Sequence, residues 1–251
     1  MPLLTRRHAL FGIAAAFLGA KDAHAVILGR PTTSKEYPWH VKLNIVEGDG
    51  YIPCCGGSVI GERWILTAAH CVADLTVDQV KAVVVDGFSL DVKELIVHPR
   101  YNKDDDTFEH DVALVGVHST RPAAVISLPS PRTHLRSGEP LIVIGTGKTE
   151  DGEESDQLRE GKVPYVSNKT CSREYDGIVP GMMCAGTKSG WTDTCPGDSG
   201  GSLIKRDSQG NATLVGITSW GGEGDDDCGT TYGVYTRVSH YYEWIMKHTS
   251  D

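Results

Sequence analysis

The stretch Cys195-Pro196-Gly197-Asp198-Ser199-Gly200-Gly201 decides how the rest of the chain is read. It surrounds a single serine with glycines, which allow tight backbone turns and leave bare N–H groups beside the hydroxyl. A serine hydroxyl becomes a good nucleophile only when a neighbouring base takes its proton. Taken alone, the stretch could equally be a simple turn, so its chemistry depends on what other segments supply.

Two earlier segments carry a base and a carboxylate. Leu66-Thr67-Ala68-Ala69-His70-Cys71 places a histidine at the end of an expected strand, flanked by small residues. His110-Asp111-Val112-Ala113-Leu114 opens a buried strand with a carboxylate. A single histidine is more often structural, and an aspartate before a strand is more often a cap or a solvated end. All three segments in one chain, in the order His, Asp, Ser, match the base, orienting group and nucleophile of a catalytic triad.

Short apolar runs separated by glycines and turns predict an all-β fold. The chain has 251 residues, of which 29 are glycine and 39% are hydrophobic, and this is enough for a real core. One segment differs, because Tyr242, Ile245 and Met246 share a helical face and predict a short C-terminal helix over 239–249. We expect strands at His40–Val46, Gly57–Ala69, Ala82–Phe88, Leu90–His98, Asp111–Val117, Pro140–Gly147, Lys162–Val166, Met182–Gly186, Gly201–Lys205, Thr213–Trp220 and Gly233–Val238.

A proline-containing link divides the expected strands into two groups of similar size. It runs from Ser119 to Ser137 and holds Pro122, Pro129 and Pro131 without sustained periodicity. The prediction is therefore one strand unit over about 26–130 and a second over about 131–236.

The first 25 residues have the pattern of a signal peptide. Arg6 and Arg7 precede an apolar run, and Ala23-His24-Ala25 is a small-x-small cleavage signal. Cleavage after Ala25 would leave a mature chain over 26–251 that begins at Val26, secreted to an extracellular or periplasmic location. An N-terminal anchor helix is the alternative, and the arginine pair also fits twin-arginine export.

The net charge and the cysteine pattern limit which classes of partner and cofactor the chain is expected to bind. The formal net charge is −9, and loss of 1–25 removes three cations and one anion to leave −11. Such a chain should avoid nucleic acid and anionic membranes and could attract cationic substrates, although solubility alone explains the charge as well. The seven cysteines include no Cys-x-x-Cys pair, and no His-x-x-x-His pattern occurs, so we expect no metal site and no cofactor.

Together the motifs resemble the chymotrypsin/trypsin family of serine proteases, in its secreted bacterial form. The resemblance covers nearly the whole mature chain. It implies an all-β fold of two six-stranded antiparallel β-barrels with the site between them, and polypeptide substrates. Further matching segments are Cys55-Gly56-Gly57-Ser58, Val97-His98-Pro99, Ser219-Trp220-Gly221 and Gly233-Val234-Tyr235-Thr236.

The resemblance also implies a role for each residue of the reaction. Ser199 attacks the scissile carbonyl, His70 carries the proton, and Asp111 orients the imidazole. The backbone N–H groups of Gly197 and Ser199 form the oxyanion hole.

The family pattern further implies selection of arginine or lysine before the cut bond. Asp193 matches the carboxylate at the base of the specificity pocket, and Thr194 could add a hydroxyl beside it. A surface aspartate in a loop is the alternative reading of Asp193. The remaining matches to substrate-binding positions are Ser219, Trp220, Gly221 and Gly233. Tyr232 stands where a tyrosine permits a sodium ion near the pocket in some members.

The same resemblance implies how the enzyme is activated and which cysteines form disulfides. The ammonium group of Val26 should pair with Asp198, and signal cleavage alone would free it. The implied disulfides are Cys55–Cys71, Cys171–Cys184 and Cys195–Cys228, which leave Cys54 as a free thiol. The loop after Cys71 is shorter than in calcium-binding trypsins, so calcium is not expected.

Two alternatives to this function stay open. The chain could be a catalytically inactive relative that serves as a binding module, or a peptidase of another specificity. We expect a monomer, with protein protease inhibitors as further candidate partners.

Overall fold

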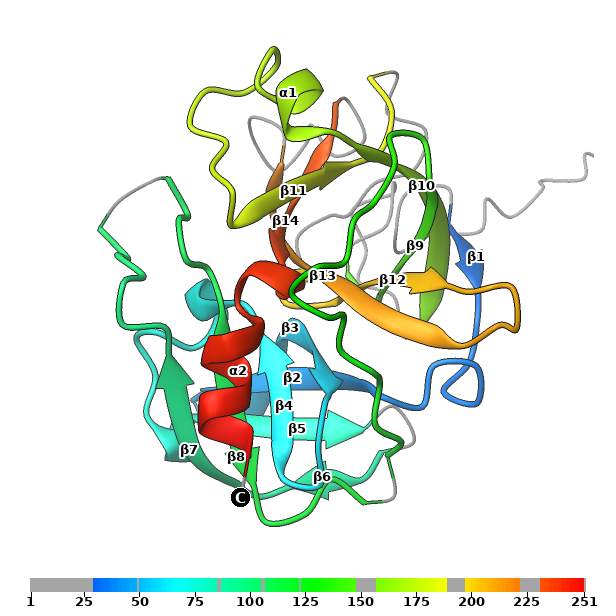
Figure 1. Cartoon of the computed structure of the whole chain (residues 1–251). Helices are drawn as coiled ribbons and strands as arrows, with labels where there is room; N and C mark the ends of the chain where they lie inside the picture. Colours follow the sequence, from blue (N-terminus) through cyan, green and yellow to red (C-terminus); the bar gives the residue numbers. More distant parts are fainter. Residues whose placement is uncertain are drawn as a thin grey trace, which may run out of the picture.

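Two antiparallel β-sheets hold most of the regular secondary structure of the described residues (Figure 1). A computed structural model describes residues 29–48, 50–84, 87–104, 107–121, 123–147, 157–188, 197–221 and 231–250. Several predicted features lie outside these residues, namely the signal peptide over 1–25, Val26, Asp193, Thr194, Cys195 and Cys228.

The first sheet contains seven strands and curls round on itself. Its last strand, β7, contacts β5 near the other edge, which gives the sheet a barrel-like shape. Every named pair in it is antiparallel. In order across the sheet, the strands are β6 (Ser89–Leu90), β5 (Val80–Val84), β2 (His40–Glu47), β3 (Gly50–Val59), β4 (Trp64–Thr67), β8 (Ala113–Val117) and β7 (Val92–Val97).

The second sheet closes completely, because β9 pairs with both β12 and β10. Six strands thus form a ring, and a short seventh strand adds to its outside. In order, they are β1 (Arg30–Pro31), β10 (Arg159–Val166), β11 (Met182–Ala185), β14 (Gly233–Arg237), β13 (Ala212–Gly221), β12 (Ser202–Arg206) and β9 (Pro140–Gly145). The expected all-β fold of two barrels is confirmed, with one two-residue strand added to six in each sheet.

The strand β1 corrects the expected division of the chain. It precedes the first sheet in sequence, yet it pairs with β10 of the second. A buried carboxylate explains this crossing: Glu160 on β10 accepts hydrogen bonds from the Tyr37 hydroxyl and the Arg30 guanidinium. The first strand within 26–130, β1, therefore belongs to the second barrel.

Burial patterns explain why these segments form strands. Along β5 the fully buried residues Val80, Ala82 and Val84 alternate with less buried ones, as expected for a strand with one face on the core. Strand β8 is buried at every position, consistent with its continuous apolar run. The long strand expected over 57–69 is instead the pair β3 and β4, joined by a tight turn that contains the exposed Glu62 and Arg63.

In the part of the chain that the structure describes, helical structure is confined to short pieces. The predicted C-terminal helix is present as the 3₁₀ turn η3 (Val238–His240) followed by α2 (Tyr242–Thr249). Ile245 of α2 is buried in the same cluster as the core of the first barrel, so the helix covers that barrel (Figure 1). The helix α1 (Asn168–Cys171) was not predicted, and it begins where the Ser167 side chain accepts from the Thr170 N–H.

The two barrels meet through close backbone and hydroxyl contacts. The hydroxyls of Ser58 in β3 and Ser202 in β12 lie 2.7 Å apart in a buried hydrogen bond. A Cβ on Gly56 would lie 2.9 Å from the Cα of Gly201, so only glycine allows this approach. The imidazole of His40 lies in the same region, 1% exposed, and neither of its ring nitrogens has a hydrogen-bond partner among the described residues.

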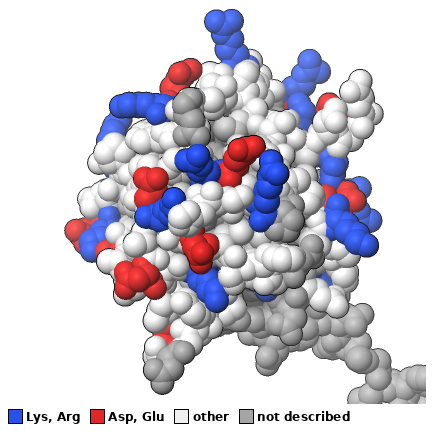
Figure 2. Space-filling model, turned by 90° about the horizontal axis from the view of Figure 1, so that it is seen from below, with Lys and Arg blue, Asp and Glu red and all other residues white. Residues whose placement is uncertain are grey.

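Charged side chains of both signs are interspersed on the face seen in Figure 2. The net negative charge therefore does not gather into one patch on the described part of this face. Equally, the described residues there form no broad basic surface of the kind that binds nucleic acid.

His40 predicts an acid limit to stability. Burial lowers the pKa of His40 from 6.5 to about 3, because the imidazolium would lose its hydration there. The unfolded chain therefore binds the proton first, and the stability from the neutral ring falls as the pH drops from 6.5 toward 3. The full effect is about 5 kcal/mol. Chemical denaturation across this range should give a flatter pH dependence for His40→Leu than for the wild type. The exposed control His118→Gln should keep the wild-type slope, and equal slopes for all three proteins would refute the assignment.

Candidate active site

Asp111 lies directly before β8, on a backbone held from both sides. His110 adopts a φ of 61°, a left-handed conformation that is uncommon outside glycine, and the Val112 N–H donates to the His110 carbonyl at 2.7 Å. The Thr236 hydroxyl of β14 donates to the Asp111 carbonyl at 2.6 Å. The carboxylate is thus fixed between the barrels, and the residue is only 1% exposed.

His70 is bound to this carboxylate twice. It lies in the 3₁₀ turn η1 (Ala69–Cys71), directly after β4, with its side chain 22% exposed. The backbone N–H of His70 donates to Asp111 Oδ1 at 2.9 Å, and His70 Nδ1 lies 2.8 Å from Oδ2. A carboxylate at Nδ1 places the proton on that nitrogen, so Nε2 of the neutral ring is left as a proton acceptor.

A β-bulge brings Ser219 to the same carboxylate. Thr218 pairs with Tyr235 and Trp220 pairs with Val234, so Ser219 is the extra residue of β13. A bulge re-aims the side chain of its extra residue. The Ser219 hydroxyl consequently donates to Asp111 Oδ2 at 2.5 Å, and the second barrel completes the set of donors around Asp111.

Ser199 is delivered to this region by its backbone. Its carbonyl accepts from the Gly56 N–H at 2.7 Å, and the next N–H, of Gly200, donates to the Thr218 carbonyl at 2.8 Å. Gly200 lies so close to the strand before His70 that a Cβ would be 2.5 Å from the Gly56 carbonyl and closer still to Thr67 Oγ1. The serine segment therefore bridges β3, β4 and β13, next to the residues that hold His70 and Asp111.

The described residues include no hydrogen bond between Ser199 and His70. Nε2 of His70 instead has Cys71 Sγ at 3.7 Å, and the Phe108 ring meets the imidazole edge-on with centroids 5.8 Å apart. Catalytic hydrogen bonds are often long without substrate and tighten in the complex. The structure thus joins His70 to Asp111 directly and brings Ser199 beside them through its backbone.

Asp198, the residue before the serine, is completely buried. Its Oδ1 accepts from the Gly147 N–H at 2.8 Å, and its carboxylate fills the space where Gly145 lacks a side chain. A buried carboxylate needs such donors to offset its lost hydration. The predicted partner Val26 lies outside the described residues.

An aromatic cluster behind Asp111 was missed by the sequence analysis. The rings of His98 and His110 stack at 4.8 Å, and His110 Nδ1 lies 3.1 Å from the Tyr241 hydroxyl. Trp244 of α2 packs 5.1 Å from His98. Burial, with a smaller effect of His110, lowers the pKa of His98 to about 4, so the His98 imidazole is neutral at neutral pH. The cluster fixes the left-handed His110, and only its separate parts are visible in the sequence.

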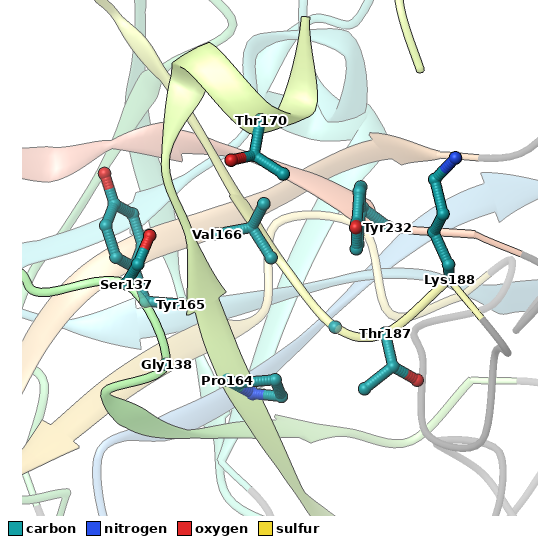
Figure 3. Close-up of a pocket in the computed structure, with 10 residues that line it drawn as sticks. Ser137, Gly138, Pro164, Tyr165, Val166, Thr170, Thr187, Lys188 and Tyr232 are labelled. Carbon is teal, nitrogen blue, oxygen red and sulfur yellow. The ribbon is translucent and has the colours of Figure 1, made fainter. Parts of the chain in front are cut away.

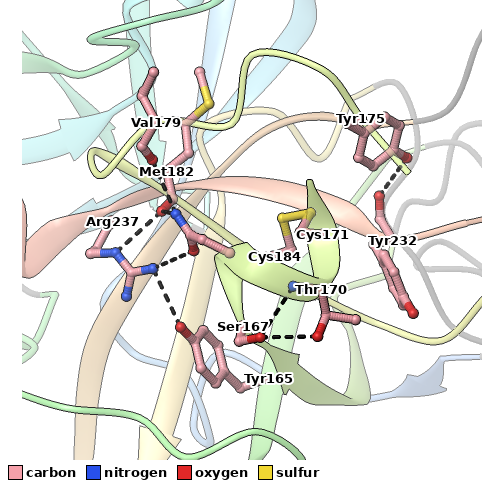
Figure 4. The surroundings of a disulfide bond; sticks show 11 residues. Tyr165, Ser167, Thr170, Cys171, Tyr175, Val179, Met182, Cys184, Tyr232 and Arg237 are labelled. Atoms are coloured by element: carbon pink, nitrogen blue, oxygen red, sulfur yellow. Dashed lines mark hydrogen bonds between the residues drawn. A yellow bond between two sulfur atoms is a disulfide. The ribbon is translucent and has the colours of Figure 1, made fainter. Parts of the chain in front are cut away.

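The predicted substrate-binding residues that the structure describes lie together in the second barrel. Gly221 and Gly233 face each other across β13 and β14, and the Trp220 ring meets the Tyr175 ring at 5.0 Å. The Tyr175 hydroxyl donates to the Tyr232 carbonyl at 2.7 Å (Figure 4). These contacts brace the strand ends beside which the specificity pocket was expected.

Two disulfides have the pairing that the resemblance implied, Cys55–Cys71 and Cys171–Cys184. Around the second, the Arg237 guanidinium donates to the Met182 carbonyl (Figure 4). It also donates to the Pro180 carbonyl and to Asn168 Oδ1. Helix α1 and strand β11 are thereby tied to β14.

A pocket of about 350 Å³ opens on the surface of the second barrel (Figure 3). Tyr165, Thr187, Lys188 and Tyr232 contribute side chains to it, and the Lys188 ammonium pairs with Glu174. None of His70, Asp111 and Ser199 lines it. It is therefore separate from the candidate catalytic residues.

One group of metal-ligand side chains occurs in the described part of the chain, Cys55, His70 and Cys71. Its two sulfurs are joined in a disulfide, so they cannot act as thiolate ligands. Within the described ranges, no helix is long and apolar enough to cross a membrane.

Comparisons with known proteins agree with this geometry. Residues 26–245 match the protein-family model described as Trypsin. Mouse serine protease 56 is 36% identical over 91% of this chain and 39% of its own length. Mouse transmembrane protease serine 11C is 35% identical over 90% of this chain and 54% of its own, and mouse complement factor I is 36% identical over 89% and 38%. The chain therefore spans roughly half or less of these relatives, and as mammalian proteins they give the expected bacterial type no support.

Two β-barrels meet at a His–Asp pair and a glycine-flanked serine, as the resemblance to the trypsin family implied. The chain belongs to the trypsin family.

The fit of Gly200 yields a prediction for Gly200→Ala. The new methyl group would overlap the Gly56 carbonyl and Thr67 at a φ of 76°, which must displace Ser199. Displacement by about 1 Å costs on the order of 10²-fold in kcat. Gly210→Ala is the matched control, since Gly210 has a φ of 87° with nothing within 4 Å of its Cβ position. Steady-state kinetics should show the loss in the first variant alone, and similar kcat values for both would contradict this role of Gly200.

Proposed function

We propose that this protein hydrolyses peptide bonds through a triad of Ser199, His70 and Asp111. The supporting observation is the Asp111 carboxylate, which takes the His70 Nδ1 proton from the first barrel and the Ser219 hydroxyl from the second. This buried carboxylate accepts hydrogen bonds from both barrels and holds the Nδ1 edge of the imidazole. The opposite edge, which carries Nε2, points away from Asp111, and Nε2 is the atom that must accept the serine proton.

The reaction follows from these positions. Ser199 Oγ attacks the scissile carbonyl while its proton passes to His70 Nε2, and the imidazolium is stabilised by Asp111. The same proton then protonates the leaving amine, which departs and leaves an acyl-enzyme on Ser199. Water repeats the sequence in reverse, with His70 as base, and releases the acid and the free enzyme.

The backbone N–H groups of Gly197 and Ser199 are proposed to stabilise the negative oxygen of the tetrahedral intermediate. Gly197 has a φ of 95° and Gly200 one of 76°, so a left-handed residue stands on each side of the Asp198–Ser199 pair. Such a turn can bring successive N–H groups to one side. Removing one donor of this kind costs about 3–4 kcal/mol in kcat.

Selection of arginine or lysine is the proposed specificity. It depends on Asp193, which a cation would have to neutralise in a closed pocket. The glycines at 221 and 233 support it, because they pair at the strand ends beside the expected pocket and neither carries a side chain that would fill it. Ser219, Trp220 and Thr194 are proposed to complete the binding of this residue and its backbone.

Release of Val26 is the proposed activation step, following secretion and removal of 1–25. The strand register supports it, since Pro31 pairs with Arg159, and Arg159 pairs on its other side with Gly145, which contacts Asp198. Neighbouring strands lie about 5 Å apart, so Pro31 is about 10 Å from Gly145. The Arg159 guanidinium also holds the Gly29 carbonyl at 2.6 Å. The three residues before Gly29 can extend about 10 Å, enough for an ammonium to approach Asp198.

A burst assay with an arginyl ester tests the proposed triad, specificity and activation together. The chain that starts at Val26 should release about one equivalent of alcohol rapidly and then turn over, because an acyl-enzyme accumulates. Ser199→Ala should give no burst, and a chain that retains residues before Val26 should be strongly impaired. A phenylalanyl ester should react far more slowly than the arginyl ester.

The outcomes separate the candidate functions. A burst in Ser199→Ala would refute the triad, and absence of any burst in the Val26 chain would favour an inactive binding module. Equal rates on the two esters would indicate a peptidase of another specificity. We further propose a monomer that protein protease inhibitors can bind, which sedimentation of the free and inhibited enzyme would test.

A further inference from the structure

Three cysteine sulfur atoms lie in a row that ends at His70, and two of them form a disulfide. Cys54 is the free cysteine of the described residues, half-buried, and its Sγ lies 3.6 Å from Cys55 Sγ. Cys55 is bonded to Cys71, whose Sγ lies 3.7 Å from His70 Nε2. A thiol, a disulfide and the proposed proton acceptor are therefore in one continuous chain of contacts.

A β-bulge explains why Cys54 reaches the disulfide at all. Neighbouring residues in a regular strand point to opposite faces. Here Leu43 pairs with Cys55 and Asn44 pairs with Pro53, so Cys54 is the extra residue of β3. The bulge re-aims its side chain, and the two neighbouring sulfurs come into contact.

We propose that Cys54, Cys55 and Cys71 form a thiol–disulfide exchange site in which Cys54 is an alternative partner for Cys71. The protein then exists as two disulfide isomers, one with Cys55–Cys71 and one with Cys54–Cys71. The exchange is internal and needs neither an oxidant nor a reductant.

The exchange step balances within the three residues. The Cys54 thiol loses its proton to solvent, and its side chain turns from its contact with Cys55 Sγ toward the far side of Cys71 Sγ. The thiolate then attacks Cys71 Sγ in line with the Cys55–Cys71 bond. The Cys54–Cys71 bond forms as the Cys55–Cys71 bond breaks, and Cys55 leaves as a thiolate that takes up a proton. Attack on Cys55 instead would close a small ring between adjacent residues, which the extended backbone of β3 opposes.

The environment sets the rate of the step. Burial raises the pKa of the Cys54 thiol, so the reactive thiolate is scarce at neutral pH and exchange there is slow. Among the described residues, His70 contacts the disulfide through Nε2. Exchange should accelerate in mildly alkaline solution, where the Cys54 thiolate is favoured.

The isomers differ in how His70 is anchored. Cys71 follows His70 directly in η1, and its disulfide ties that turn to β3. When Cys71 is bonded to Cys54 instead of Cys55, the disulfide attaches η1 to β3 one residue earlier, and the His70 imidazole shifts with it. This consequence for activity rests on the proposed triad, whereas the exchange itself does not.

Locked variants test the exchange by counting thiols in denaturant. In the Ser199→Ala background, Cys55→Ser should form the Cys54–Cys71 bond and show two fewer free thiols than Cys71→Ser. An equal thiol count in these two variants would overturn the proposal. A Cys71→Ser protein without the extra thiols would also overturn it, because Cys54 would then have bonded to Cys55.

Alkylation of the wild-type chain tests whether exchange occurs without mutation. After incubation in mildly alkaline buffer and acid quenching, peptide mapping should find part of the label on Cys55 and the rest on Cys54. Label on Cys54 alone would overturn the exchange.

Activity of the locked isomers tests the link to His70. Cys54→Ser keeps the Cys55–Cys71 tie and should retain the wild-type kcat. Cys55→Ser should lose on the order of 10²-fold, the usual effect of misplacing a catalytic group by about 1 Å. Equal kcat values would overturn the coupling, whereas inactivity of both, with the expected thiol counts, would count against the triad alone.

Discussion

The buried carboxylate of Asp111 is the interaction on which the rest of the site depends. It accepts the backbone N–H and Nδ1 of His70 from the first barrel and the hydroxyl of Ser219 from the second. Hydrogen bonds to a charged group stabilise a protein by about 1.5–3 kcal/mol each. If a donor is removed, the buried carboxylate loses that compensation for its lost hydration, and the folded state is destabilised. The carboxylate therefore couples the docking of the barrels to the orientation of the imidazole, and one contact serves both fold and chemistry.

Irregular backbone supplies the atoms around this carboxylate. Ser219 reaches Asp111 because it is the extra residue of a bulge in β13, and Cys54 reaches the Cys55–Cys71 disulfide because it is the extra residue of a bulge in β3. His110 takes a left-handed conformation directly before Asp111. Regular strands build the two barrels, whereas departures from regularity at their edges place the functional groups.

The sequence predicted an all-β fold and the segments that carry Ser199, His70 and Asp111, because short motifs and strand periodicity are local properties. The arrangement in two barrels was predicted through the resemblance to the trypsin family. It did not predict the crossing of β1 to the second barrel, which depends on the buried Glu160 that Tyr37 and Arg30 contact. It also missed the packing of His98, His110 and Tyr241. Bulge positions and aromatic stacks depend on register and tertiary contact, which a single sequence does not contain.

Asp111→Asn tests the role of this carboxylate most directly. The amide keeps the shape of the side chain but offers an N–H donor as well as an oxygen acceptor. It therefore no longer fixes the proton of His70 on Nδ1, and Nε2 is no longer reliably available as the proton acceptor. With an arginyl ester, kcat should fall by about 10⁴-fold. A kcat within about tenfold of the wild type would contradict the central role of the Asp111 carboxylate.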